Sequence, residues 1–128
     1  MHVCSRVVLA LAFFSSLGCG PAVDRPGTLA RLRTAIRAEV SDHAVLERHN
    51  QLARETAEAG ALEGMFQHEL EEALGRGTEC GVSQLCAQHD FRSNDWLYEL
   101  GHAPGDEELP AGPSLLVGFD STGRVFRT

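Results

Sequence analysis

The first half of the chain carries apolar residues at the spacing of an α-helix. After Thr28, the expected N-cap, apolar side chains recur every three or four residues, at Leu29, Leu32, Ile36 and Val40. Ser41 and Asp42 interrupt this pattern before it restarts, and either residue could cap a new helix. Residues 28–59 are therefore expected to form one long amphipathic helix or two short ones, closed by Gly60 as the C-terminal cap.

A second amphipathic pattern covers Gly64–Gly75. The glutamates of this segment are expected to face water, and the opposite face consists of Met65, Phe66, Leu70, Ala73 and Leu74. This pattern predicts one more helix before the character of the sequence changes.

A period of two replaces the helical spacing in the last third of the chain. The segment Asn94–Leu100 alternates between two faces, the first of them formed by Trp96, Tyr98 and Leu100. Residues 114–120 and 123–127 predict two further strands, which Asp120–Gly123 joins as a tight turn. Between the first and second strands, Gly101–Pro113 is rich in proline, glycine and acidic residues and is expected to be a mobile loop.

Helices that precede strands in this order indicate the α+β class. We expect N-terminal helices packed on one face of a three-stranded antiparallel β-meander, in the order α-α-β-β-β. A chain of 128 residues is long enough for one such domain and too short for two.

The first twenty residues have the three-part order of a secretory signal peptide. Arg6 precedes the apolar run Val7–Phe14, and small residues follow it. This run is shorter than the roughly 20 apolar residues that a membrane-spanning helix needs. Two cleavage sites are open: one after Ala22, with small residues at the required positions, and one before Cys19.

The stretch Ser16–Cys19 resembles the lipobox of bacterial lipoproteins, in which a small residue precedes a cysteine that is lipidated. Such a modification would make Cys19 the first residue of the mature protein and hold it to the membrane through acyl chains. The residue after Cys19 is not aspartate, which by analogy with lipoprotein sorting favours the outer membrane. The predicted organisation is a signal peptide at 1–18, a tether at 19–27, an N-terminal helical extension at 28–63 and a C-terminal domain at 64–128.

The formal net charge of −7 argues against nucleic acid as a partner, because phosphate binding needs clustered cations. The sequence contains no nucleophile elbow, no P-loop and no zinc-protease motif, since Glu72 stands where the HELEE stretch would need its second histidine. We therefore expect no enzymatic activity, no cofactor and no metal. His43 and His49 are six positions apart and are expected to be two solvent-exposed side chains.

Cys80 and Cys86 lie six positions apart in the second half of the chain. A disulfide, a zinc site with His89 and His68, and a pair of free thiols are all compatible with this spacing. Export from the cytoplasm favours the disulfide. If Cys19 carries lipid and Cys4 leaves with the signal peptide, these two cysteines are the pair that remains.

The C-terminal domain resembles the SmpA/OmlA (BamE-like) family of small outer-membrane lipoproteins. The resemblance covers about half the chain, from residue 64 to the end, and rests on Gly64, Met65, Leu74, Gly75, Trp96, Tyr98, Val117, Phe119, Asp120, Gly123 and Val125. It implies a non-enzymatic scaffold that contacts proteins of the envelope, with the β-barrel assembly complex as the expected partner.

These features together predict a lipid-anchored outer-membrane lipoprotein on the periplasmic face that acts as a protein-binding scaffold. Trp96, Tyr98 and Phe119 are the candidate partner-binding residues on the sheet. The alternative is a secreted, inhibitor-like binding module, because β-lactamase inhibitor domains share the arrangement of helices on a sheet. That alternative requires cleavage after Ala22 and no lipid on Cys19.

Overall fold

A computed structural model describes residues 23–128, without the side chains of residues 106–108. The predicted signal peptide, both cleavage sites and the lipidation of Cys19 lie outside the described residues. The helices are α3 (Arg25–Arg37), α4 (His43–Ala59), α5 (Gln67–Leu74) and α6 (Gln84–Gln88). The strands are β1 (Thr78–Glu79), β2 (Trp96–Glu99), β3 (His102–Ala103), β4 (Asp106–Pro110), β5 (Ser114–Phe119) and β6 (Val125–Arg127).

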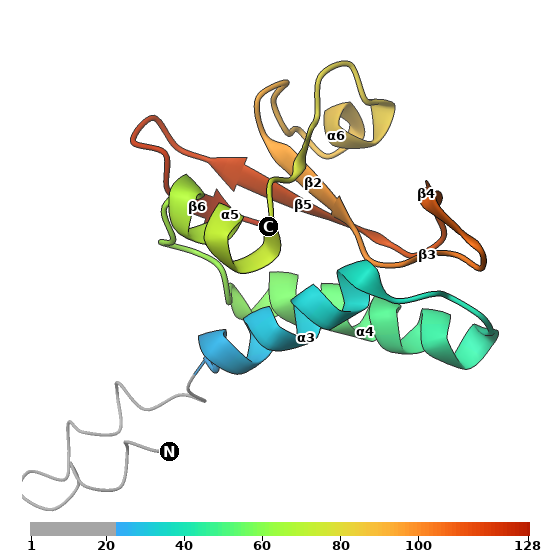
Figure 1. Cartoon of the computed structure of the whole chain (residues 1–128). Helices are drawn as coiled ribbons and strands as arrows, with labels where there is room; N and C mark the ends of the chain where they lie inside the picture. Colours follow the sequence, from blue (N-terminus) through green and yellow to red (C-terminus); the bar gives the residue numbers. More distant parts are fainter. Residues whose placement is uncertain (1–22) are drawn as a thin grey trace, which may run out of the picture.

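The α+β class and the three predicted strands are confirmed. Strands β2, β5 and β6 form an antiparallel meander in which Trp96 pairs with Val117, and β1 adds a fourth strand beside β2. Helices α3 and α4 lie side by side below this sheet, and α6 lies above it (Figure 1). The helical layer therefore covers one face of the sheet, as the order of helices before strands predicted, but β2 is buried on both faces and is not the half-buried strand that its alternation suggested.

The prediction of a mobile loop at Gly101–Pro113 was wrong. This segment contains the antiparallel hairpin of β3 and β4. The link between α3 and α4 holds the hairpin in place, because the His102 N–H donates to the Ala38 carbonyl at 3.0 Å and the Val40 N–H donates to the His102 carbonyl at 2.9 Å. Backbone pairing thus orders a stretch whose composition is typical of a loop.

Residues 28–59 form two helices rather than one. Helix α4 begins after Asp42, whose carboxylate accepts a hydrogen bond from the Val45 N–H, and it ends at Gly60 in the left-handed conformation, with φ of 63°. Helix α3 begins earlier than expected and includes the last three residues of the predicted tether. Its N-cap is Asp24, which accepts from the Gly27 N–H, so the assignment of Thr28 as N-cap was wrong. Thr28 is instead buried inside the helix.

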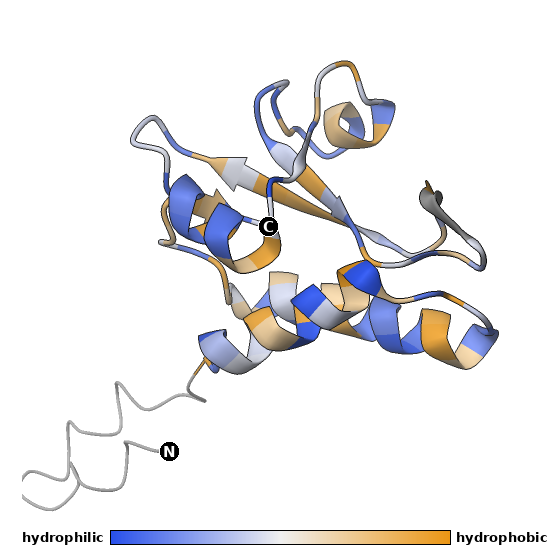
Figure 2. Ribbon diagram, in the orientation of Figure 1, coloured by the Kyte–Doolittle hydropathy of each residue, from blue (hydrophilic) through white to orange (hydrophobic). Residues whose placement is uncertain are grey.

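The main core lies between the sheet and the helices α3, α4 and α5. The apolar face of β2 and β5 packs there against residues from both halves of the chain, including Leu32, Ala35, Ala53, Leu62 and Leu70. Figure 2 shows apolar residues concentrated on β2 and β5 and on parts of the helices. The helical extension and the C-terminal domain of the sequence prediction therefore share one core.

The opposite face of the sheet is covered by a loop closed by a disulfide. Cys80 and Cys86 are bonded, with their Cα atoms 5.9 Å apart, which confirms the predicted pair. They form a second apolar cluster with Leu97 and Leu116. Closing a loop of this length stabilises the fold by about 2.4 kcal/mol in the chain-entropy treatment. The short helix α6 inside this loop was not predicted.

The turn between β5 and β6 is organised by the carboxylate of Asp120. It accepts hydrogen bonds from the Thr122 hydroxyl at 2.7 Å, the Thr122 N–H at 2.8 Å and the Arg124 N–H at 3.0 Å. The bond from the Thr122 side chain, followed by those from the two backbone N–H groups, holds the pKa of Asp120 below its ordinary value of 3.8. The ionised form is thus the one that the fold favours.

Acidification is therefore expected to weaken the native protein through Asp120. A lowered pKa gives stability that is present above the ordinary value and is lost as the pH falls through the folded-state value. Asp120→Asn keeps the shape of the turn but removes the titration. Its free energy of unfolding should fall less steeply than that of the wild type between about pH 5 and pH 2 in urea titrations. Parallel curves for the two proteins would contradict the role assigned to this carboxylate.

Candidate functional site

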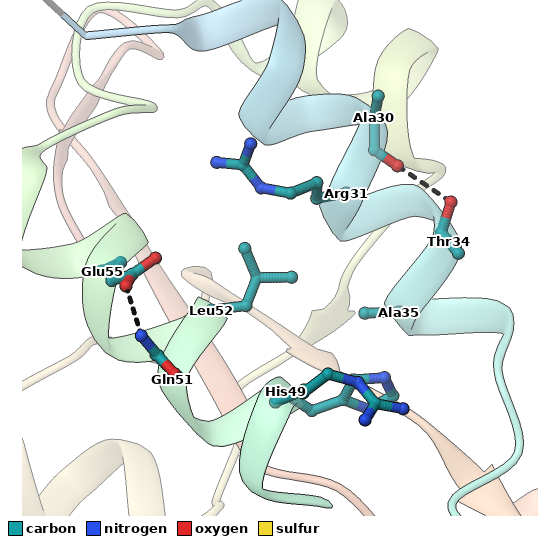
Figure 3. Close-up of a pocket in the computed structure, with 9 residues that line it drawn as sticks. Ala30, Arg31, Thr34, Ala35, His49, Gln51, Leu52 and Glu55 are labelled. Atoms are coloured by element: carbon teal, nitrogen blue, oxygen red, sulfur yellow. Dashed lines mark hydrogen bonds between the residues drawn. The ribbon is translucent and has the colours of Figure 1, made fainter. Parts of the chain in front are cut away.

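An open groove runs between α3 and α4. Its volume is about 480 Å³. It is lined from α3 by Ala30, Arg31, Thr34 and Ala35, and from α4 by Arg48, His49, Gln51, Leu52 and Glu55. In Figure 3, Arg31 and Ala35 extend from α3 toward Leu52 of α4, whereas Ala30 and Thr34 stand at the opposite edge of α3. A volume of this size falls within the range of ligand-binding sites.

The floor of the groove is apolar because α3 carries small side chains opposite α4. Ala35 is buried on the α3 side, whereas Leu52 of α4 remains half-buried. Ala30 and Thr34 are too short to cover Leu52 from above. The helix pair therefore leaves an apolar strip open to solvent, while the main core on its other side is closed.

The rim of the groove carries two arginines and one glutamate, an excess of one positive charge. Arg31 and Arg48 stand on opposite helices, and in the described part of the chain no carboxylate oxygen lies within 4.0 Å of either guanidinium. Arg31 donates a hydrogen bond to the Thr28 hydroxyl at 3.3 Å. Glu55 is the acidic residue of the lining, and it accepts a bond from Gln51 at 2.8 Å. Both guanidinium groups can therefore accept an anionic partner.

His49 lies at the base of the groove and is 8 % exposed, so the expectation of a solvent-exposed side chain was wrong. Its Nδ1 lies 2.7 Å from the Leu100 carbonyl oxygen. A carbonyl oxygen accepts hydrogen bonds, so Nδ1 carries the proton in this contact. The bond connects α4 to the end of β2 and fixes one wall of the groove. His43, the other histidine of this helix, is exposed as expected.

The three aromatic residues predicted to bind a partner lie in the core. Trp96, Tyr98 and Phe119 are 0 %, 4 % and 8 % exposed, and the Trp96 ring meets each of the other two rings edge to face. Side chains from α3, α4 and α5 pack over them in the main core. These three side chains therefore stabilise the fold and offer no surface to a partner.

Tyr98 is held by its hydroxyl as well as by its ring. The hydroxyl donates a hydrogen bond of 2.8 Å to the Gly75 carbonyl. Burial first, and the charge of Glu71 second, raise the pKa of Tyr98 well above its usual range. The phenol therefore stays protonated and links β2 to the end of α5.

His68 and Glu99, two other polar residues, each make a contact of their own outside the groove. His68 stacks on the Phe66 ring, with the ring centroids 5.6 Å apart. Glu99 accepts a bond from the Ser114 hydroxyl at 3.0 Å. Among the side chains of residues 23–105 and 109–128, no three histidine, cysteine or acidic residues come together in a way that could hold a metal ion.

The distribution of charge along the sequence marks α3 as unusual, although the hydrophobic pattern does not. Helix α3 has four arginines and no acidic residue, although the whole chain has a net charge of −7. Of these arginines, Arg31 lines the groove, whereas Arg25 and Arg33 donate hydrogen bonds to backbone carbonyls elsewhere in the fold. The small residues Ala30 and Thr34 on the same helix complete the pattern.

Comparisons of this chain with protein-family models, with curated proteins and with solved structures returned no significant match. Among the helices that the structure describes, none is both long enough and apolar enough to cross a bilayer. What the protein does must therefore be inferred from its own residues and geometry.

Proposed function

We propose that this chain is a lipid-anchored, non-enzymatic protein-binding scaffold of the bacterial outer membrane, and that the α3–α4 groove receives its partner. The observation that carries this proposal is the groove itself, an apolar strip with a cationic rim on a domain whose core is otherwise closed. The groove offers a surface for docking rather than a nucleophile beside a base.

The position of the groove along the chain supports the membrane part of the proposal. Helix α3 begins at Arg25, six positions after Cys19. Six extended residues span at most about 20 Å. An acyl group on Cys19 would therefore hold the groove close to the membrane surface, within reach of other proteins there.

The resemblance to the SmpA/OmlA family suggests the process in which the scaffold acts. Gly64, Trp96 and Phe119, which carry part of that resemblance, hold structural positions here, in a turn and in the core. We propose that the partners are envelope proteins of the β-barrel assembly complex.

The mass of the intact protein, extracted from envelope membranes, tests the anchor. We expect a mature chain that starts at Cys19 and carries acyl groups, and a Cys19→Ala variant that is not acylated. A cross-linked pull-down of the wild-type protein should then return an outer-membrane barrel complex, and Leu52→Glu in the groove should remove it. A chain with no acyl mass would overturn the anchor, and recovery of the same complex with Leu52→Glu would overturn the role of the groove.

A secreted, inhibitor-like binding module remains the second candidate because of one surface feature. Val82 is fully exposed in the loop that the Cys80–Cys86 disulfide closes. A constrained loop that presents an apolar side chain suits insertion into a pocket of another protein. The same mass measurement separates the candidates, since this one requires a chain that begins at Val23 without lipid.

A further inference from the structure

We infer that the α3–α4 groove binds an amphipathic helix of a partner protein, and that this helix carries aspartate or glutamate beside its apolar face. The inference rests on the proposed function and deepens it by naming the chemistry of the partner. It is drawn from the shape of the groove, the nature of its floor and the charges on its rim.

The shape fits a helix. The groove lies between two packed helices, and its lining runs from Ala30 to Ala35 on one and from Arg48 to Glu55 on the other. Seven residues of helix rise about 11 Å, which is two turns. A third helix can lie along such a groove at the usual 8–10 Å from its neighbours when the side chains between them are small. Ala30, Thr34 and Ala35 provide that clearance.

The apolar floor of the groove favours a partner that contributes apolar side chains. Leu52 is the largest apolar residue of the lining and is only half-buried. Two or three apolar side chains, one per helical turn, would cover it and bury Ala30 with it. The favourable binding free energy comes from removing this apolar strip from water, which is the main driving force when a helix binds in a groove.

The rim selects the charge of the partner. Arg31 and Arg48 flank the floor from opposite sides and have no carboxylate within 4.0 Å among the described side chains. An acidic residue on each flank of the docked helix would meet one of them. Because the whole chain is acidic, an acidic partner is repelled elsewhere on its surface, and these two arginines give the groove its preference.

Two synthetic peptides test the inference directly. Both have 18 residues and the same leucine and alanine positions on one helical face, but one has glutamates and the other lysines on the flanks. Each peptide is labelled with fluorescein, and its fluorescence anisotropy is followed as the mature protein is added. The mature protein is the processed chain whose first residue the mass measurement identifies. We expect one-to-one binding of the glutamate peptide, about tenfold tighter than the lysine peptide, with the difference shrinking as salt is added.

Three variants separate the groove from general charge effects. The double variant Arg31→Glu, Arg48→Glu should reverse the preference and bind the lysine peptide more tightly. Leu52→Glu should lose both peptides. Arg92→Glu changes an exposed arginine outside the groove lining and should keep the wild-type affinities. Because Leu52 also packs against the main core, circular dichroism of each variant checks that the fold is retained before the affinities are compared.

Equal affinities for the two peptides, no binding of either one, or an unchanged preference in the double variant would overturn the inference. So would a concentration-dependent dimer in sedimentation that Leu52→Glu abolishes, because the groove would then belong to a second copy of this chain. None of these outcomes depends on Cys19. Failure of the lipid anchor is therefore distinguishable, since it appears in the mass alone.

Discussion

Trp96→Ala is expected to lower the free energy of unfolding by about 3–5 kcal/mol. The indole is fully buried, and its ring lies 5.1 Å from that of Phe119 and 6.4 Å from that of Tyr98. Gly77 packs so closely against it that an added Cβ there would lie 2.8 Å from the Cβ of Trp96. Small domains unfold at a total cost of about 5–15 kcal/mol, so this loss removes much of the stability. Urea unfolding followed by circular dichroism measures it.

Trp96→Phe is the matched control. The indole Nε1 is buried and finds no hydrogen-bond partner among the described residues, so the tryptophan carries the cost of an unsatisfied donor. Phenylalanine removes this donor and keeps most of the aromatic contact with Phe119. Its loss of stability should therefore be clearly smaller than that of Trp96→Ala. If the two variants lost equal stability, the aromatic contact that phenylalanine keeps with Phe119 would contribute nothing measurable to the core.

Gly112→Ala is the second variant with a large expected effect, about 3 kcal/mol of lost stability. A Cβ at this position would lie 1.8 Å from the Leu100 carbonyl oxygen, which is backbone and cannot rotate away. The same oxygen holds Nδ1 of His49. Moving it would break that bond as well, so the chemical shifts of the His49 ring should change together with the unfolding midpoint.

Gly105→Ala controls for the general cost of replacing a glycine. Gly105 has φ of 76°, and none of the atoms that the structure describes lies within 4 Å of an added Cβ. Only backbone strain of about 1–2 kcal/mol is expected there, without any change at His49. A Gly105→Ala variant as unstable as Gly112→Ala would show that the clash with Leu100 is not the cause.

The elements that the sequence predicted are those in which a long pattern of burial decides the conformation. The alternation around Trp96 and the helical spacing of Leu32 and Ile36 identified β2 and α3, because one face of each meets the core. Helix α6 and strand β1, with five and two residues, are too short to show a period. The β3–β4 hairpin was missed for another reason, since its order comes from backbone bonds to Ala38 and Val40 that no local composition encodes.

The candidate site was the part least accessible to sequence reasoning. Aromatic residues on a strand were assigned to binding, but Trp96, Tyr98 and Phe119 face the helices and are buried. The groove instead depends on which residues of two helices lie opposite each other. The set of side chains that line the groove follows from how α3 and α4 pack, whereas the excess of arginine on α3 could be seen in the sequence directly.

The bonds that join the N-terminal helices to the C-terminal half also set the order in which the protein can fold. His49 meets a residue 51 positions away, and His102 reaches the Arg37 carbonyl across 65 positions. A chain that emerges from its N-terminus has α3 and α4 long before it has the strands on which they pack. Contacts of such separation form late and slowly. The helices α3 and α4 therefore lack the strands that complete their core until the C-terminal half of the chain has been synthesised.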